Sequence, residues 1–142
     1  MVNMNIFLDT NIWLRYFIGD NENQRDIVET ILQKVTESEV NLCTSSFVLS
    51  EFIYVESSFY KITKTDILED IEAITSIKNL WLIEKTNLLV SIELYKKSQS
   101  KMTKWSDCMI VTQIPAHNSL CSFDTRLEKL IGKHRFTHPS TI

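Results

Sequence analysis

The stretch Met4-Asn5-Ile6-Phe7-Leu8-Asp9-Thr10-Asn11-Ile12-Trp13-Leu14 decides the fold, because two apolar segments meet there at a single acid. Residues 2–8 predict a short buried strand, and residues 12–18 predict a helix that Gly19 stops. Asp9 would then lie where a strand ends and a helix begins. Taken alone, such an acid is best explained as a helix N-cap. The alternative is a metal ligand, since the carboxyl ends of parallel strands line the ligand crevice of α/β proteins.

The rest of the chain alternates helix and strand patterns. Ser45 or Ser46, and Thr63 or Thr65, are suited to cap two of the helices. Alternation of this kind predicts a three-layer α/β/α sandwich with a small central parallel sheet. No repeat or linker is visible, so residues 1–142 are expected to form one domain. Beyond residue 19, we predict helices around 27–35, 47–55, 63–74, 88–101, 107–113 and 127–131, and strands at 40–44, 81–84 and 120–123.

The composition excludes several classes of protein. A chain of 142 residues with 44% hydrophobic residues can bury a core without disulfides. Its three cysteines form no C-x-x-C pair and are expected to be core residues of a cytoplasmic protein. No apolar run is long enough to cross a membrane. With only two glycines, the chain cannot build a P-loop or a dinucleotide-binding turn.

Charge is distributed unevenly along the sequence. Residues 1–83 carry 6 Lys+Arg and 13 Asp+Glu, whereas residues 84–142 carry 9 Lys+Arg and 5 Asp+Glu. Although the net charge is −3, the second part could present a positive face to phosphates. For any single lysine, a solvated helix face is the simpler interpretation. The acidic first part could instead bind a basic segment of a partner.

Four acids are embedded in apolar sequence at the edge of a predicted element: Asp9, Glu51, Asp107 and Asp124. The first and last follow strands, and the other two lie on helices. Partly buried carboxylates are costly to ionise, and only Asp124 has a nearby cation, Arg126. A divalent ion would compensate the four charges.

The donor set favours a hard metal ion. Carboxylates without neighbouring His or Cys select Mg²⁺ or Mn²⁺ over zinc. His134 and His138 lack a nearby third ligand, and we expect them to be surface residues. A metal in an acidic cleft, beside a basic stretch, indicates phosphoryl chemistry on a polyanion, because the ion can activate water and neutralise charge on a phosphate.

In their order, Asp9-Thr10-Asn11, Ser50-Glu51-Phe52, Trp105-Ser106-Asp107 and Ser122-Phe123-Asp124 resemble the motifs of PIN-domain ribonucleases. Among these, the chain looks most like VapC toxins of VapBC toxin–antitoxin pairs. The resemblance runs from Met4 to about Arg135. It implies a parallel sheet flanked by helices, Mg²⁺- or Mn²⁺-dependent cleavage of RNA, a homodimer, and a small antitoxin that inserts into the active-site groove.

The resemblance also implies roles for single residues. Asp9, Glu51 and Asp107 would bind the main metal ion, and Asp124 would hold it through water or help to bind a second ion. Asn11 and Ser122 would position waters or carboxylates, and Arg126 would contact phosphate. Cleavage would leave a 5′-phosphate and a 3′-hydroxyl. Aromatic residues could line a groove for a partner helix, with Phe52 expected in the core and Tyr16 and Tyr60 at the surface: Trp13, Tyr16, Phe17, Phe52, Tyr54, Phe59 and Tyr60.

Three alternatives stay open. A haloacid-dehalogenase-like phosphohydrolase also places an Asp after its first strand, but it needs a second Asp where this chain has Asn11. A PIN-like scaffold could bind RNA or protein without cutting. A housekeeping RNA-processing nuclease would differ from a toxin mainly in its partner and substrate, and the short chain favours the toxin.

Overall fold

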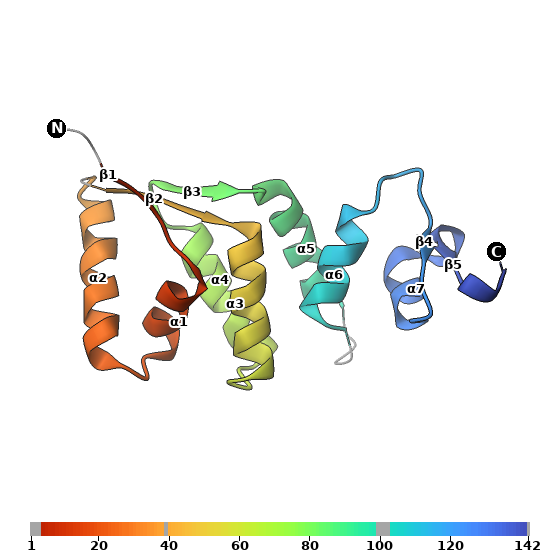
Figure 1. Ribbon diagram of the computed structural model, residues 1–142, viewed down its shortest axis with the longest axis horizontal. Helices are drawn as coiled ribbons and strands as arrows, with labels where there is room; N and C mark the ends of the chain where they lie inside the picture. The colour runs from red at the N-terminus through yellow and green to blue at the C-terminus, as the bar shows by residue number, and fades with distance from the viewer. Residues whose placement is uncertain (1–3, 39, 99–102, 142) are drawn as a thin grey trace. The chain divides into compact units, whose positions relative to one another are not determined.

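The structure is a computed structural model that describes residues 4–38, 40–98 and 103–141. It divides into two compact units, Met1–Lys85 and Thr86–Ile142, called here the first and the second unit. Figure 1 shows the elements in chain order: β1 (Met4–Phe7), α1 (Thr10–Ile18), α2 (Glu22–Thr36), β2 (Val40–Ser45), α3 (Ser46–Ser58), α4 (Lys64–Thr75), β3 (Leu80–Ile83), α5 (Lys85–Lys97), α6 (Trp105–Gln113), β4 (Leu120–Cys121), α7 (Arg126–Ile131), η1 (Lys133–Arg135), β5 (Phe136–Thr137) and η2 (Pro139–Thr141).

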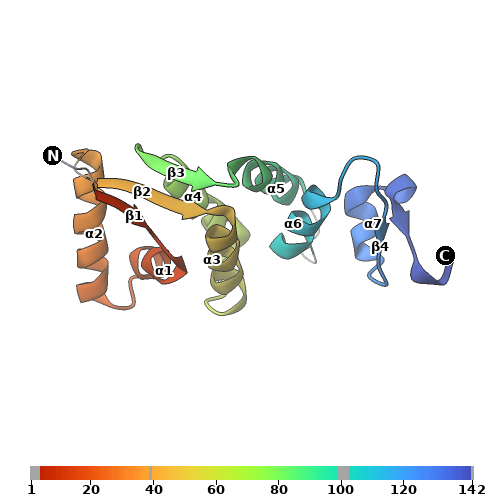
Figure 2. The same ribbon diagram turned by 45° about the horizontal axis from the view of Figure 1, so that its top comes forward.

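The first unit is built on a three-stranded parallel sheet in the order β1-β2-β3. Both ribbon views show α1 to α4 on one side of this sheet (Figures 1 and 2). Strands joined by helices are parallel because the chain must cross back between them. Seven α-helices and this small sheet lie within the described residues, which is consistent with the predicted three-layer α/β/α fold.

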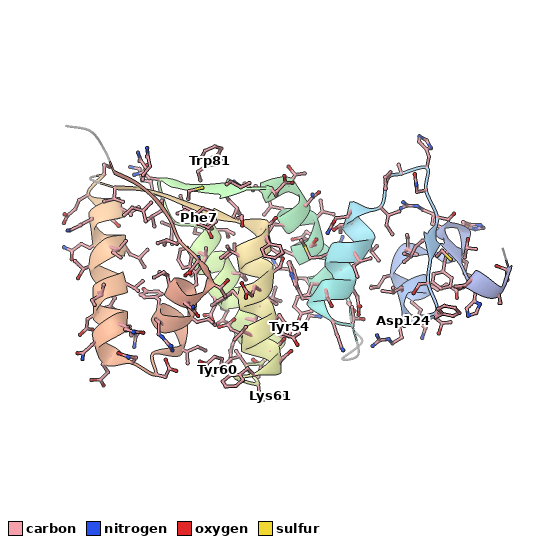
Figure 3. All side chains as sticks on the ribbon, viewed as in Figure 1. Phe7, Tyr54, Tyr60, Lys61, Trp81 and Asp124 are labelled. Atoms are coloured by element: carbon pink, nitrogen blue, oxygen red, sulfur yellow. The ribbon has the colours of Figure 1, made fainter. Side chains whose placement is uncertain are left out.

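Side chains of the sheet alternate between a buried and an exposed face, as the two-residue period of a strand requires. Leu42 and Thr44 of β2 and Leu82 of β3 point into the core. On the other face, Phe7 is 52% exposed and Trp81 is 71% exposed (Figure 3). The register aligns these two residues on either side of Cys43, so the exposed face carries an apolar row.

Polar side chains fix the starts of the first four helices. The side-chain oxygens of Asp9, Asn21, Ser45 and Thr63 each accept a hydrogen bond from a backbone N–H in the first turn, at 3.0–3.3 Å. Of the candidate caps predicted from sequence, the structure selects Ser45 and Thr63. Gly19 ends α1 with φ = 68°, a left-handed conformation that a glycine adopts at low cost.

The second unit has its own core, where α5 and α6 pack through Tyr95 and Trp105, whose rings meet edge to face at 5.5 Å. The hydroxyl oxygens of Ser91 and Thr112 lie 2.8 Å apart and join the same two helices. Strands β4 and β5 form a separate two-stranded parallel sheet beside α7. Throughout the described ranges, every helix is too short or too polar to span a lipid bilayer.

Element boundaries differ from the prediction in the second unit. Helix α6 begins at Trp105, two residues before the predicted start, and α5 begins at Lys85. The predicted end of that helix, Lys101, lies outside the described residues, as does the predicted start of the first strand, Val2. Strand β4 ends at Cys121 rather than at residue 123, because the Ser122 hydroxyl accepts the Asp124 N–H at 2.9 Å and turns the chain. Strand β5 was not predicted.

Only one of the three cysteines is a core residue. Cys108 is buried, Cys43 is half-buried on the exposed face of the sheet, and Cys121 is exposed. The prediction of three core cysteines is therefore wrong for Cys43, which is only half-buried, and for Cys121, since β4 is too short to be covered on both faces.

Candidate active site

Asp9 lies where the sequence predicted it, between β1 and α1, with an exposed side chain. Its Oδ1 accepts the N–H of Ile12 at 3.3 Å, so it is the N-cap of α1. The cap uses one carboxylate oxygen in a weak, long hydrogen bond. The N-cap interpretation is therefore correct, and it does not exclude a metal role because the second oxygen is available. Asn11 follows on α1 and is also exposed.

Thr10 connects Asp9 to the second predicted ligand. Its hydroxyl donates to Oε2 of Glu51 at 2.5 Å, while Thr10 itself is only 7% exposed. This hydrogen bond places Glu51, on α3, next to the residue that follows Asp9. The structure thus brings these two acids to one end of the first unit. Thr10 belongs to the motif Asp9-Thr10-Asn11, although no role was predicted for it from the sequence.

Buried hydrogen bonds hold the same end of the sheet in place. The Thr44 hydroxyl donates to the carbonyl oxygen of Leu8 at 3.0 Å and accepts the indole N–H of Trp13 at 3.4 Å. Thr44 and Trp13 are both fully buried. These bonds join the end of β1 to β2 and α1, so the backbone that carries Asp9 is fixed from two sides.

Glu51 is more open than predicted. Its neighbours Phe52 and Ile53 are buried, but Glu51 is exposed, as are Phe47 and Tyr54 of the same helix. Positions 47, 51 and 54 are four and three residues apart, which places them on one helical stripe. The apolar residues around Glu51 therefore belong to the buried face of α3, whereas the Glu51 carboxylate itself lies on the exposed face.

In the second unit, Asp107 is the third residue of α6 and is 7% exposed. Its Oδ2 accepts the backbone N–H of Lys104 at 3.0 Å, which closes the first turn of the helix. A carboxylate near a helix N-terminus is also stabilised by the helix dipole. The predicted partial burial of Asp107 is confirmed.

Asp124 follows β4 and forms a close ion pair with Arg126. The guanidinium donates from Nε to Oδ1 at 2.9 Å and from Nη2 to Oδ2 at 2.6 Å. Hydrogen bonding by Arg126, together with the charges of Arg126 and Lys104, lowers the pKa of Asp124 to about 2. Asp124 is therefore ionised at any pH at which a nuclease would be assayed.

Arg126 and Ser122 hold this acid in place. Arg126 spans both oxygens of Asp124, and Ser122 accepts the Asp124 backbone N–H. The Asp107 charge further raises the pKa of the Arg126 guanidinium, after the contributions of Asp124. Ser122 orients the backbone of Asp124 rather than its carboxylate. Contact of Arg126 with phosphate stays a prediction.

The carboxylates are the hard oxygen donors that Mg²⁺ and Mn²⁺ prefer. The first unit supplies Asp9 and Glu51, and the second supplies Asp107 and Asp124. Among residues 4–38, 40–98 and 103–141, no three His, Cys, Asp or Glu side chains are arranged to hold a metal ion. The donor chemistry of these residues fits a divalent ion.

Basic residues of the second unit line a surface hollow of about 440 Å³. Lys129 and Lys133 contribute positive charge, and Glu128 is the acid in the lining, together with Thr125 and Gly132. Residues 86–142 as a whole carry 8 Lys+Arg and 4 Asp+Glu. The hollow is suited to contact with an anion such as a phosphate.

A comparison with known protein families shows to which family the chain belongs. The PIN domain model matches residues 6–133, from β1 to the start of η1, and so includes all four acids. The chain belongs to the PIN-domain family. PIN domains are generally nucleases and usually bind divalent metal ions. No curated protein and no solved structure matches the chain.

The aromatic residues of this PIN domain are distributed differently from the prediction. Phe52 is fully buried, as predicted. Tyr16 and Tyr60 are half-buried, whereas Tyr54 and Phe59 are 63% and 76% exposed. Tyr60 is partly covered because its ring contacts Phe59 edge to face at 4.9 Å. The sequence pattern placed a helix at 47–55 but did not show on which side its aromatic residues emerge.

Proposed function

We propose that this PIN domain is a divalent-metal-dependent endoribonuclease and the toxin of a VapBC-type toxin–antitoxin pair. The main support for nuclease activity is the match to the PIN domain family over residues 6–133. The order of the four acid motifs, their oxygen donors and the positive charge of the second unit support RNA as the substrate. The motif order supports the toxin role.

In this proposal, Asp9, Glu51 and Asp107 hold Mg²⁺ or Mn²⁺, and Asp124 assists through water or a second ion. The ion, when bound, activates water and neutralises charge on the scissile phosphate. Thr10 orients Glu51 through its 2.5 Å hydrogen bond. Arg126 keeps Asp124 ionised and fixed in orientation. Asn11 positions water.

Cleavage of a bulk structured RNA by the purified chain tests the nuclease activity, with Mg²⁺, Mn²⁺ or EDTA. We expect discrete products with either metal ion, none with EDTA, and none from Asp9→Asn. Asp26→Asn is the matched control, since Asp26 is an exposed acid of α2. A chain that binds RNA but never cuts it, with any divalent ion, would instead be a scaffold.

Growth of a host that expresses the chain separates a toxin from a processing nuclease. A toxin is expected to arrest growth, and Asp9→Asn is expected to relieve the arrest. Co-expression of a small protein encoded beside the gene should relieve it as well and should co-purify with the chain as the antitoxin. A homodimer is expected on gel filtration. Growth that continues despite active enzyme would favour the housekeeping nuclease.

A further inference from the structure

Glu56 is a carboxylic acid in the interior of the first unit. It lies on α3, five residues after Glu51, and its side chain is 0% exposed. Among the described residues, no N–H or hydroxyl group donates a hydrogen bond to Oε1 or Oε2. Ionised carboxylates without a donor or a counter-ion are rarely buried, because removing the charge from water is very costly.

The neighbours of this carboxyl are two further acids on α4. The Asp70 carboxyl lies close enough to Glu56 to share a proton with it, and Asp66 lies close enough to act through its charge. Asp66 and Asp70 are four residues apart and therefore lie on the same side of the helix. Two ionised carboxylates can only accept hydrogen bonds, so a bond between Glu56 and Asp70 requires a proton on one of them.

The other elements that pack on α3 offer little positive charge to neutralise an ionised Glu56. Helix α1 carries Arg15, whose guanidinium pairs with Asp20 at 3.0 Å. Strand β2 carries Cys43, on the sheet face opposite the buried Leu42. A metal ion would be another solution, but no suitable group of three ligands lies within the described ranges. Protonation is the remaining way to neutralise the Glu56 carboxylate.

We propose that Glu56 and Asp70 share one proton and that this proton clamps α3 to α4. Burial, followed by the proximity of the Asp70 carboxyl and the charges of Asp70 and Asp66, raises the pKa of Glu56 to about 9. Burial also raises the pKa of Asp70. The clamp fixes the helix that carries Glu51, and it is independent of whether the chain cleaves RNA.

The proton gives stability a definite pH dependence. In the unfolded chain Glu56 releases its proton near its ordinary pKa of 4.5, whereas in the folded chain it keeps the proton to about pH 9. The folded state therefore binds more protons between these values, so stability decreases as pH rises from 4.5 to 9. The contribution is complete below pH 4.5 and is lost above pH 9.

Thermal unfolding of the full chain from pH 5 to pH 9 tests the clamp with Glu56→Gln. The glutamine amide imitates the protonated acid, because its N–H can donate to Asp70 at every pH. The Tm of Glu56→Gln minus the Tm of the wild type should increase steadily with pH, by roughly 5 °C or more between pH 5 and pH 9. Glu69→Gln, at an exposed position of α4, is the control and should follow the wild type.

Parallel Tm profiles for Glu56→Gln and the wild type would overturn the clamp. Should the variant fail to fold, the side-chain carboxyl carbon of Glu56 can be titrated by NMR in the wild-type chain. A midpoint far above 4.5 supports the shared proton. A midpoint near 4.5, with the fold intact, overturns it.

Discussion

At the scale of single residues, Asp9 combines a structural and a chemical role in one carboxylate. Its Oδ1 caps α1, and the same side chain is the first of the proposed metal ligands. Asparagine caps helices about as well as aspartate, whereas alanine does not cap them. Substitutions at Asp9 can therefore separate the cap from the charge.

We predict that Asp9→Asn leaves the metal-free stability unchanged or slightly raised, because the cap remains and a negative charge disappears. Asp9→Ala should lower the free energy of unfolding by about 1 kcal/mol. Urea unfolding in EDTA measures both. Asn21→Ala, which removes the cap of α2, should cost a similar amount yet keep cleavage. Equal losses in Asp9→Asn and Asp9→Ala would contradict a cap that tolerates the amide.

At the scale of elements, the Thr10–Glu51 hydrogen bond joins the first turn of α1 to the middle of α3. The two helices pack directly on each other. A short hydrogen bond from a buried hydroxyl to a carboxylate is stronger than one between neutral groups. It both stabilises the helix pair and restricts the rotamers of Glu51.

Thr10→Val replaces the hydroxyl with a methyl group of similar size. We expect a loss of about 1–2 kcal/mol in the free energy of unfolding and weaker binding of Mn²⁺. Urea unfolding and calorimetric titration with Mn²⁺ measure the two effects. Thr65→Val, at an exposed position of α4, is the control. Mn²⁺ affinity equal to that of the wild type would show that Thr10 does not position Glu51.

At the scale of the whole molecule, charge divides along the same boundary as the two units. The first unit carries 7 Lys+Arg and 14 Asp+Glu, and the second carries 8 and 4. Binding of a polyanion releases counterions, so each phosphate contact by a lysine steepens the dependence of affinity on salt. RNA is therefore expected to contact the second unit in preference to the first.

We predict that Lys129→Gln with Lys133→Gln weakens RNA binding and reduces the slope of log affinity against log salt by roughly 1–2. These residues line the hollow of the second unit. The matched control is Lys34→Gln with Lys78→Gln, two exposed lysines of the first unit. Fluorescence anisotropy with a single-stranded RNA, in the Asp9→Asn background, measures the slopes. An equal decrease in the control pair would show a general charge effect.

The sequence by itself determined the order of elements in the first unit and the positions of the four acids. Strand and helix periods, and the pairs of candidate caps at Ser45 or Ser46 and at Thr63 or Thr65, depend on residues a few positions apart. The turn at Gly19 is equally local. For this reason, β1 and α1 and the junction at Asp9 were predictable from the stretch at residues 4–14 alone.

Only the tertiary structure decided which polar groups meet and which faces are covered. Glu56 lies in the same apolar helix as Glu51, yet packing against α4 buries the first and leaves the second exposed. The Thr10–Glu51 bond joins residues 41 positions apart. Contacts of this kind arise when distant segments pack and exclude water, and no local period of the sequence records them.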